Sequence, residues 1–284
     1  MFSTQARPVN GRVFLSCRQI IQVMSTQLFR RYIGIDYSGA QTAEAGLKGL
    51  RVYVAEREGP STEVVPPPGA GRYWSRRGLA EWLAGELTSE APTIIGIDHG
   101  FSFPQRYFET YGLAPDWPAF LEDFQRHWPT DEPGTSVESI RRGECGQGAA
   151  RVGNSRWRRL TELGVGAKSV FHFDVPGSVA KSTHAGLPWL RQLRRQMGAQ
   201  LHWWPFDGWL PEPGRSLIAE IYPSLWSRDY AVEGRTPDQH DAWVVATWLQ
   251  MTNREGQFSD YLQPRLGDEE RLIAGYEGWI LGVR

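Results

Sequence analysis

The sequence contains only two cysteines, Cys17 and Cys145, and no run of apolar residues long enough to cross a membrane. Cysteines this few and this far apart exclude a disulfide scaffold or a cysteine-rich zinc site, and they fit a reducing compartment. A membrane-spanning helix needs about 20 consecutive apolar residues. We therefore expect a cytoplasmic protein without a membrane partner.

The sequence also lacks an excess of charge of either sign, because the net charge is −1 and the isoelectric point is near 6.6. This balance excludes a global basic field, so any nucleic-acid partner must be bound by a local patch. One basic stretch surrounds Trp157 and is either such a patch, with an aromatic ring to stack a base, or a solvated surface. It consists of Arg141, Arg142, Arg151, Arg156, Arg158, Arg159 and Lys168.

Apolar segments alternate with turn residues in an order typical of α/β proteins. In residues 50–56 apolar and polar side chains alternate, which predicts a strand with one exposed face. The order of elements favours an open mixed central sheet with helices on both faces. We predict strands over 31–36, 50–56, 93–98, 200–205 and 216–222, and helices from Ser75 and over 118–127, 155–163, 186–197, 238–251 and 268–276.

The length of 284 residues and the 40% hydrophobic content allow one substantial core. We expect a single domain over residues 30–284. Residues 1–29 are expected to form a poorly ordered extension without function, in which Met24 is an alternative start of translation. Residues 101–168, rich in proline and arginine, are expected to be an elaboration over the site and not part of the core.

Two predicted strands end in the same four residues, Ile-Gly-Ile-Asp, which places Asp36 and Asp98 at their carboxyl ends. A single aspartate at a strand end is equally compatible with a turn. Two strands that end alike bring their carboxylates together if they are neighbours. Ligands of open α/β sheets gather at this edge, so we predict a site there.

Three further carboxylates complete the predicted cluster. Glu220 lies inside an apolar strand, where its charge must be paired with an arginine or bound to a metal. Asp241 precedes an apolar helical run and should face the sheet, whereas Asp238 is either an accessory ligand or a first-turn acid. Converging carboxylates repel one another, and Mg²⁺ or Mn²⁺ relieves that repulsion and supports phosphodiester hydrolysis.

Six segments, in this order, resemble the DUF429 family of predicted RNase H-like nucleases. They are GIDYSGA (34–40), IIGIDHGFSFP (94–104), SVFHFDVPGSVAKSTHAGLPWLRQLR (169–194), WPFDGW (204–209), AEIYPS (219–224) and DQHDAW (238–243). The resemblance covers the chain from about Arg31 to its end. It implies an RNase H-like fold and a metal-dependent nuclease with Asp36, Asp98, Glu220 and Asp241 as metal ligands and catalytic residues.

Other residues are weaker candidates. His99 and His240 adjoin predicted ligands and could act as accessory acids, although His99 should face away from Asp98 because neighbouring strand residues alternate. Possible substrate-binding residues are Ser38, Ser178, Lys181, His172, Arg156 and Arg158.

Two alternative functions stay open. One is a non-catalytic module that binds nucleic acid or a nucleotide on an RNase H-like frame. The other is an actin-like phosphotransferase, whose first phosphate loop also begins with Gly-Ile-Asp, as residues 34–36 do here. The sequence lacks the Asp-Gly-Gly and Gly-Gly motifs of that class, and it lacks a P-loop and a Gly-x-Ser-x-Gly elbow.

Overall fold

The computed structural model describes residues 28–284, so the predicted extension and Met24 lie almost wholly outside the described residues. Residues 28 and 29 belong to the fold. The backbone N–H of Leu28 donates to Asn253 (3.0 Å) and Phe29 is buried. The described fold therefore includes these two residues, which were assigned to the extension.

The core is a mixed six-stranded sheet in the order β3-β2-β1-β4-β6-β5. The strands β1, β4, β6 and β5 are parallel, and β2 pairs antiparallel with both β1 and β3. Their bounds are β1 Arg31–Asp36, β2 Arg51–Glu56, β3 Thr62–Glu63, β4 Thr93–Asp98, β5 Leu201–Trp203 and β6 Ser216–Glu220. The prediction of an α/β protein with a mixed central sheet is confirmed.

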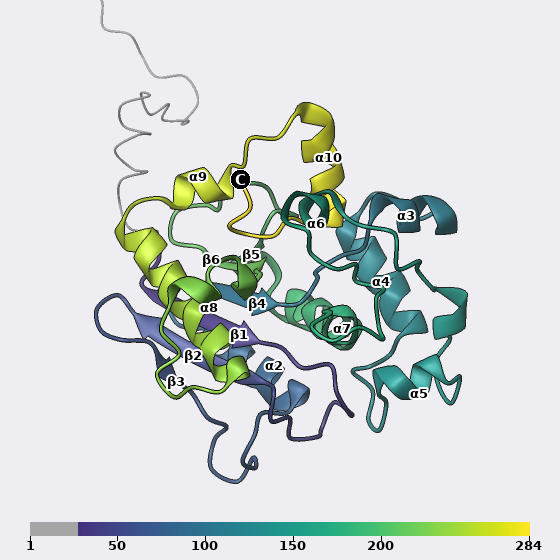
Figure 1. Cartoon of the computed structure of the whole chain (residues 1–284), viewed down its shortest axis with the longest axis horizontal. Helices are drawn as coiled ribbons and strands as arrows, with labels where there is room; N and C mark the ends of the chain where they lie inside the picture. Colours follow the sequence, from purple (N-terminus) through teal and green to yellow (C-terminus); the bar gives the residue numbers. More distant parts are fainter. Residues whose placement is uncertain (1–27) are drawn as a thin grey trace, which may run out of the picture.

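Helices cover both faces of this sheet (Figure 1). One face packs against α8, and the other packs against α2 and α7, with α4 behind α7. The helices are α2 Arg76–Glu86, α3 Gln105–Tyr111, α4 Trp117–His127, α5 Val137–Arg141, α6 Leu160–Val165, α7 Ala180–Met197, α8 Pro237–Arg254, α9 Phe258–Leu262 and α10 Asp268–Glu277, with short 3-10 turns at Gly148–Ala150, Gly198–Gln200, Pro223–Leu225 and Ser227–Asp229.

Three local expectations are wrong. The strand predicted to have one exposed face, β2, is buried on both faces over Val52–Ala55, because α8 covers the side expected to be open. The helix predicted over 155–163 begins only at Leu160. The segment 101–168 contributes to the core through its first part, since the rings of Phe103 and Phe120 pack edge to face there and Phe103 contacts His184 of α7.

Side-chain hydrogen bonds cap the first turns of α2 and α8. The Ser75 hydroxyl accepts from the Gly78 backbone N–H (3.0 Å), as predicted, and the Thr236 hydroxyl accepts from Gln239 at the start of α8 (3.3 Å). Among residues 28–284, no helix has the length and hydropathy to span a membrane.

Candidate functional site

The repeated Ile-Gly-Ile-Asp segments form adjacent parallel strands. In the register of β1 and β4, Gly34 pairs with Gly96 and Asp36 pairs with Asp98. Neighbouring strands lie roughly 4.8 Å apart, so the two aspartates end side by side at the carboxyl edge of the sheet. The predicted juxtaposition of Asp36 and Asp98 is therefore present.

The glycines of the repeat decide which helix covers these aspartates. A Cβ on Gly34 would overlap the backbone of Ala242 and Ala246, and one on Gly96 would lie 2.8 Å from Val245 Cγ1. The central turns of α8 thus rest directly on the glycines. Because side chains alternate along a strand, the aspartate two residues later points to the same face, toward the start of α8.

We expect Gly34→Ala to destabilise the fold by about 1–3 kcal/mol, because the added methyl group must push α8 off β1. Gly85→Ala in α2 is the control, since a Cβ there meets no atom within 4 Å and no strained backbone. It should be neutral or stabilise by up to about 1 kcal/mol. Urea unfolding of both variants checks this prediction, and equal stabilities would contradict the close contact.

The first turns of α8 add two carboxylates to the pair. The helix runs antiparallel to β1, since Asn253 near its end donates to the Tyr32 hydroxyl (2.7 Å) while its beginning lies near Asp36. Asp238 and Asp241 are both partly buried in these turns. The positive end of the helix dipole lies here, so the backbone of α8 partly compensates the negative charge of these carboxylates.

The four carboxylates, Asp36, Asp98, Asp238 and Asp241, are called the acidic cluster below. Burial raises the pKa of Asp98 to about 8, and the charges of Asp241 and Glu220 add to this effect. Burial and the charges of Asp98, Asp238 and Asp241 raise the pKa of Asp36 well above its ordinary value. Burial likewise raises the pKa of Asp241.

No lysine, arginine or histidine forms an ion pair with the acidic cluster within residues 28–284. Arg51, which pairs with Asp36 across the strands, directs its guanidinium to Glu63 (3.0 Å). When its carboxylates are ionised, the cluster therefore carries repulsion that the charge of Arg51 relieves only in part and that a divalent cation would remove.

Whether the acidic cluster fits a metal ion depends on its donors and their spacing. Its oxygen donors are those that Mg²⁺ and Mn²⁺ prefer. Among the described residues, no three His, Cys, Asp or Glu side chains are gathered closely enough to hold one ion together. Mg²⁺ is commonly held by one or two carboxylates and keeps several waters. The cluster thus fits a cation held by the Asp36 and Asp98 pair, and not a closed protein cage.

Glu220 has a different role from the predicted one. It pairs in register with Ile97, so it faces α7, on the side of the sheet opposite to Asp98. Both its oxygens accept from Arg159, from Nη2 at 2.5 Å and from Nη1 at 2.6 Å. The interpretation that was left open, pairing with an arginine, is correct, and Glu220 is not free to bind a metal.

The two histidines named as accessory acids serve the packing instead. His99 is 1% exposed, faces away from Asp98 as predicted, and bonds to the Gly100 carbonyl through Nδ1 (2.9 Å). Burial lowers its pKa to about 4, so it is neutral at pH 7. His240 bonds to the Ser227 carbonyl (2.9 Å) and lies parallel to the Trp243 ring. Neither one is placed as an acid for the site.

The predicted substrate-binding residues differ in their surroundings. Ser38 lies next to Asp238, since both approach the position of a Cβ on Gly49 within 3.7 Å. Lys181 is paired with Glu138 (2.6 Å). Ser178 accepts from Ala180 near the start of α7 and lies between Gly177 and Val179, which line a pocket with Asp98, whereas His172 is half-buried and Arg156 and Arg158 are exposed.

The predicted basic patch around Trp157 is largely neutralised. Arg151 forms a bidentate pair with Asp123 (2.7 Å), and Arg141 pairs with Asp174 (3.1 Å). Arg159 is 1% exposed and is held by two glutamates. The stretch therefore offers much less free positive charge than its composition indicated.

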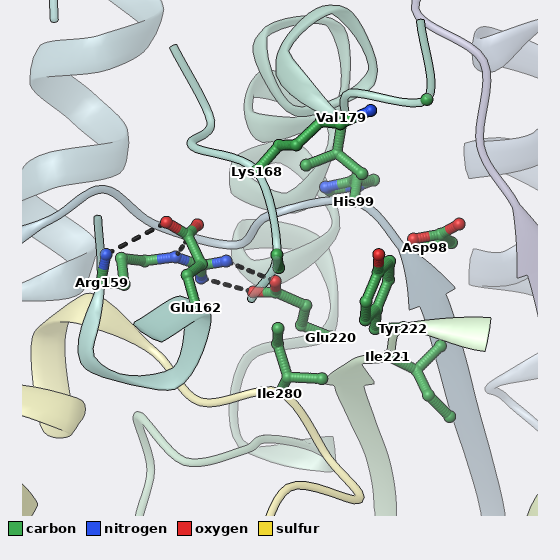
Figure 2. Close-up of a pocket in the computed structure, with 12 residues that line it drawn as sticks. Asp98, His99, Arg159, Glu162, Lys168, Val179, Glu220, Ile221, Tyr222 and Ile280 are labelled. Carbon is green, nitrogen blue, oxygen red and sulfur yellow. Dashed lines mark hydrogen bonds and ion pairs between the residues drawn. The ribbon is translucent and has the colours of Figure 1, made fainter. Parts of the chain in front are cut away.

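A pocket opens beside Asp98 and contains two residues that the sequence did not single out as site residues (Figure 2). Lys168 extends over the pocket from the loop after α6, and Tyr222 follows β6. Buried Arg159 lines it from the opposite side. In the sequence, Lys168 was noted only as part of the basic stretch and Tyr222 only as part of the segment AEIYPS, because the packing of the loops is what brings them to this pocket.

Comparisons with known proteins give no assignment. No model of a protein family matches the chain, and neither a search of curated proteins nor one of solved structures finds a match. The resemblance to predicted RNase H-like nucleases stays a prediction.

Proposed function

We propose that this protein is a metal-dependent nuclease with an RNase H-like fold. The observation that carries the proposal is the acidic cluster itself, in which carboxylates from two parallel strands and one helix converge without a paired cation. The family resemblance implies carboxylates on the first strand, on a later strand, on the strand of Glu220 and on the helix of Asp241, and all but Glu220, which pairs with Arg159, are found in the acidic cluster. The strand order is compatible with that fold.

Asp36 and Asp98 would hold Mg²⁺ or Mn²⁺, with Asp241 and Asp238 close enough to contribute charge. Such an ion lowers the pKa of a bound water and stabilises the leaving oxygen of a phosphodiester. The protein's own contribution is to keep the carboxylates at the sheet edge and to limit their solvation. In the metal-free state Asp98 holds a proton at neutral pH, because its pKa is about 8.

The test is cleavage of labelled single- and double-stranded DNA and RNA in Mg²⁺, in Mn²⁺ and in chelator. We expect metal-dependent cleavage that falls by at least about 10³-fold in Asp36→Asn/Asp241→Asn, because the variant removes one strand ligand and the helix carboxylate. Asp268→Asn, an exposed acid in α10, is the matched control and should retain full activity.

No cleavage of any of these substrates by folded protein would overturn the proposal. The non-catalytic binding module would then be the better description. Equal activity in the wild-type protein and in the Asp36→Asn/Asp241→Asn variant would point instead to a contaminating nuclease.

A further inference from the structure

The pocket beside Asp98 contains one cation that is not neutralised by a carboxylate. Arg159 is neutralised by two carboxylates, because its Nε donates to Glu162 (2.8 Å) and its two terminal nitrogens donate to Glu220. Lys168 forms no ion pair within residues 28–284, and its ammonium group donates only to the Pro176 carbonyl. An ammonium group has three donors, so two remain for a ligand.

The position of Lys168 relates this free charge to the acidic cluster. Lys168 and Asp98 line the same pocket, and the Tyr222 hydroxyl lies in it on the Asp98 side (Figure 2). The hydrogen bond to Pro176 fastens the side chain to the 175–178 turn, so it is held over the pocket. A ligand that reaches both residues would therefore place one anionic group at Lys168 and a separate reacting group near Asp98.

We propose that Lys168 binds a phosphate group of a nucleic-acid backbone, next to the phosphodiester that is cleaved at the acidic cluster. The inference rests on the proposed function, since it names the part of the site that holds the substrate. A point charge on a flexible stem recognises phosphate without reading a base, so the contact is independent of sequence.

The first experiment needs neither metal nor activity. The chain has only three lysines, Lys48, Lys168 and Lys181, so a protein with ¹³C-labelled lysine side chains gives three resolvable signals. Titration with inorganic phosphate at pH 7 in chelator should shift the Lys168 signal and leave the other two unchanged. An unchanged Lys168 signal, or an equal shift of all three, would overturn the proposal.

The second experiment uses cleavage of a single-stranded oligonucleotide. Lys168→Met should raise KM roughly tenfold, and it should reduce the slope of log KM against log salt by about 0.7, which is the loss of one phosphate contact. Lys168→Arg should recover most of the affinity. Lys48→Met, an exposed lysine outside the pocket, is the matched control and should change neither quantity.

The two proposals fail in different ways. If the wild-type protein cleaves nucleic acid but Lys168→Met has the KM and salt slope of the wild-type protein, the phosphate contact is refuted and the nuclease stands. If phosphate shifts the Lys168 signal but nothing is cleaved, the phosphate site stands and the nuclease is refuted.

Discussion

Replacing Asp98 by Asn is expected to stabilise the metal-free protein at pH 8 and at the same time to abolish cleavage. Burial and neighbouring carboxylates raise the pKa of Asp98 to about 8, far above the value near 3.9 of an unfolded chain. Between these two values the unfolded chain is ionised while the folded protein keeps a proton. This difference in proton binding lowers the stability of the wild-type fold. Asparagine does not ionise, so the variant lacks this destabilisation.

The sign of the pH dependence follows from proton binding. Below about pH 4 both states are protonated and Asp98 has no effect on stability. From pH 4 to 8 the folded state binds more protons than the unfolded state, so the contribution of Asp98 destabilises the fold progressively, and above pH 8 it levels off. We expect Asp98→Asn to gain about 2–4 kcal/mol over the wild-type protein at pH 8 and nearly nothing at pH 4.

Urea unfolding of both proteins in chelator, at pH 4, 6 and 8, measures this difference directly. Asp268→Asn provides the comparison for a surface acid and should follow the wild-type curve. Adding Mg²⁺ at pH 8 should stabilise the wild-type protein and leave Asp98→Asn unaffected. A variant that is less stable than the wild-type protein at pH 8 would show that the carboxylate is favourably solvated or paired.

The second large effect is expected at Arg159. Arg159→Met should destabilise the fold by about 3–5 kcal/mol, because it leaves buried Glu162 and Glu220 without their counter-charge. Both glutamates are less than 6% exposed, so water cannot replace the guanidinium. The loss should be larger at pH 8 than at pH 5, because burial raises the pKa of Glu162 and its protonation at the lower pH relieves part of the loss.

A double-mutant cycle separates this ion pairing from the packing of the arginine stem. Arg159→Met/Glu220→Gln should be more stable at pH 8 than Arg159→Met alone, since one of the two uncompensated charges is gone. Arg158→Met is the control, because the neighbouring Arg158 is exposed and should tolerate the change within about 0.5 kcal/mol. Additive effects of the Arg159 and Glu220 substitutions would contradict a paired network.

Three members of the predicted cluster, Asp36, Asp98 and Asp241, lie in the acidic cluster because their signals are local, whereas the fourth, Glu220, does not. The repeated Ile-Gly-Ile-Asp segment places Asp36 and Asp98 at strand ends, and the apolar run after Asp241 turns that helix toward the sheet. To bring Asp36 and Asp98 together, the prediction needed only the further assumption that their two strands are neighbours. The boundaries of β1 and β4 followed from the same apolar patterns.

The errors concern residues whose environment is set by distant parts of the chain. Glu220 and Asp98 both end strands, but the face that each side chain takes depends on the register between β4 and β6, which no local pattern encodes. The burial of β2 depends on α8, about 190 residues later. Lys168 reaches the pocket only through the packing of the loop after α6.

The contact between α8 and the glycines of β1 and β4 has a consequence for the choice of ion. Backbone rests on backbone at Gly34, so no side chain can rearrange to let the helix move outward. The helix carboxylates Asp238 and Asp241 are then held where they do not join the Asp36 and Asp98 pair around one ion. Mg²⁺ binds oxygen at about 2.1 Å, whereas Ca²⁺ needs about 2.4 Å and more ligands. A site that offers two strand carboxylates and leaves the other positions to water therefore suits Mg²⁺ better than Ca²⁺, which could gain further protein ligands only if the helix moved.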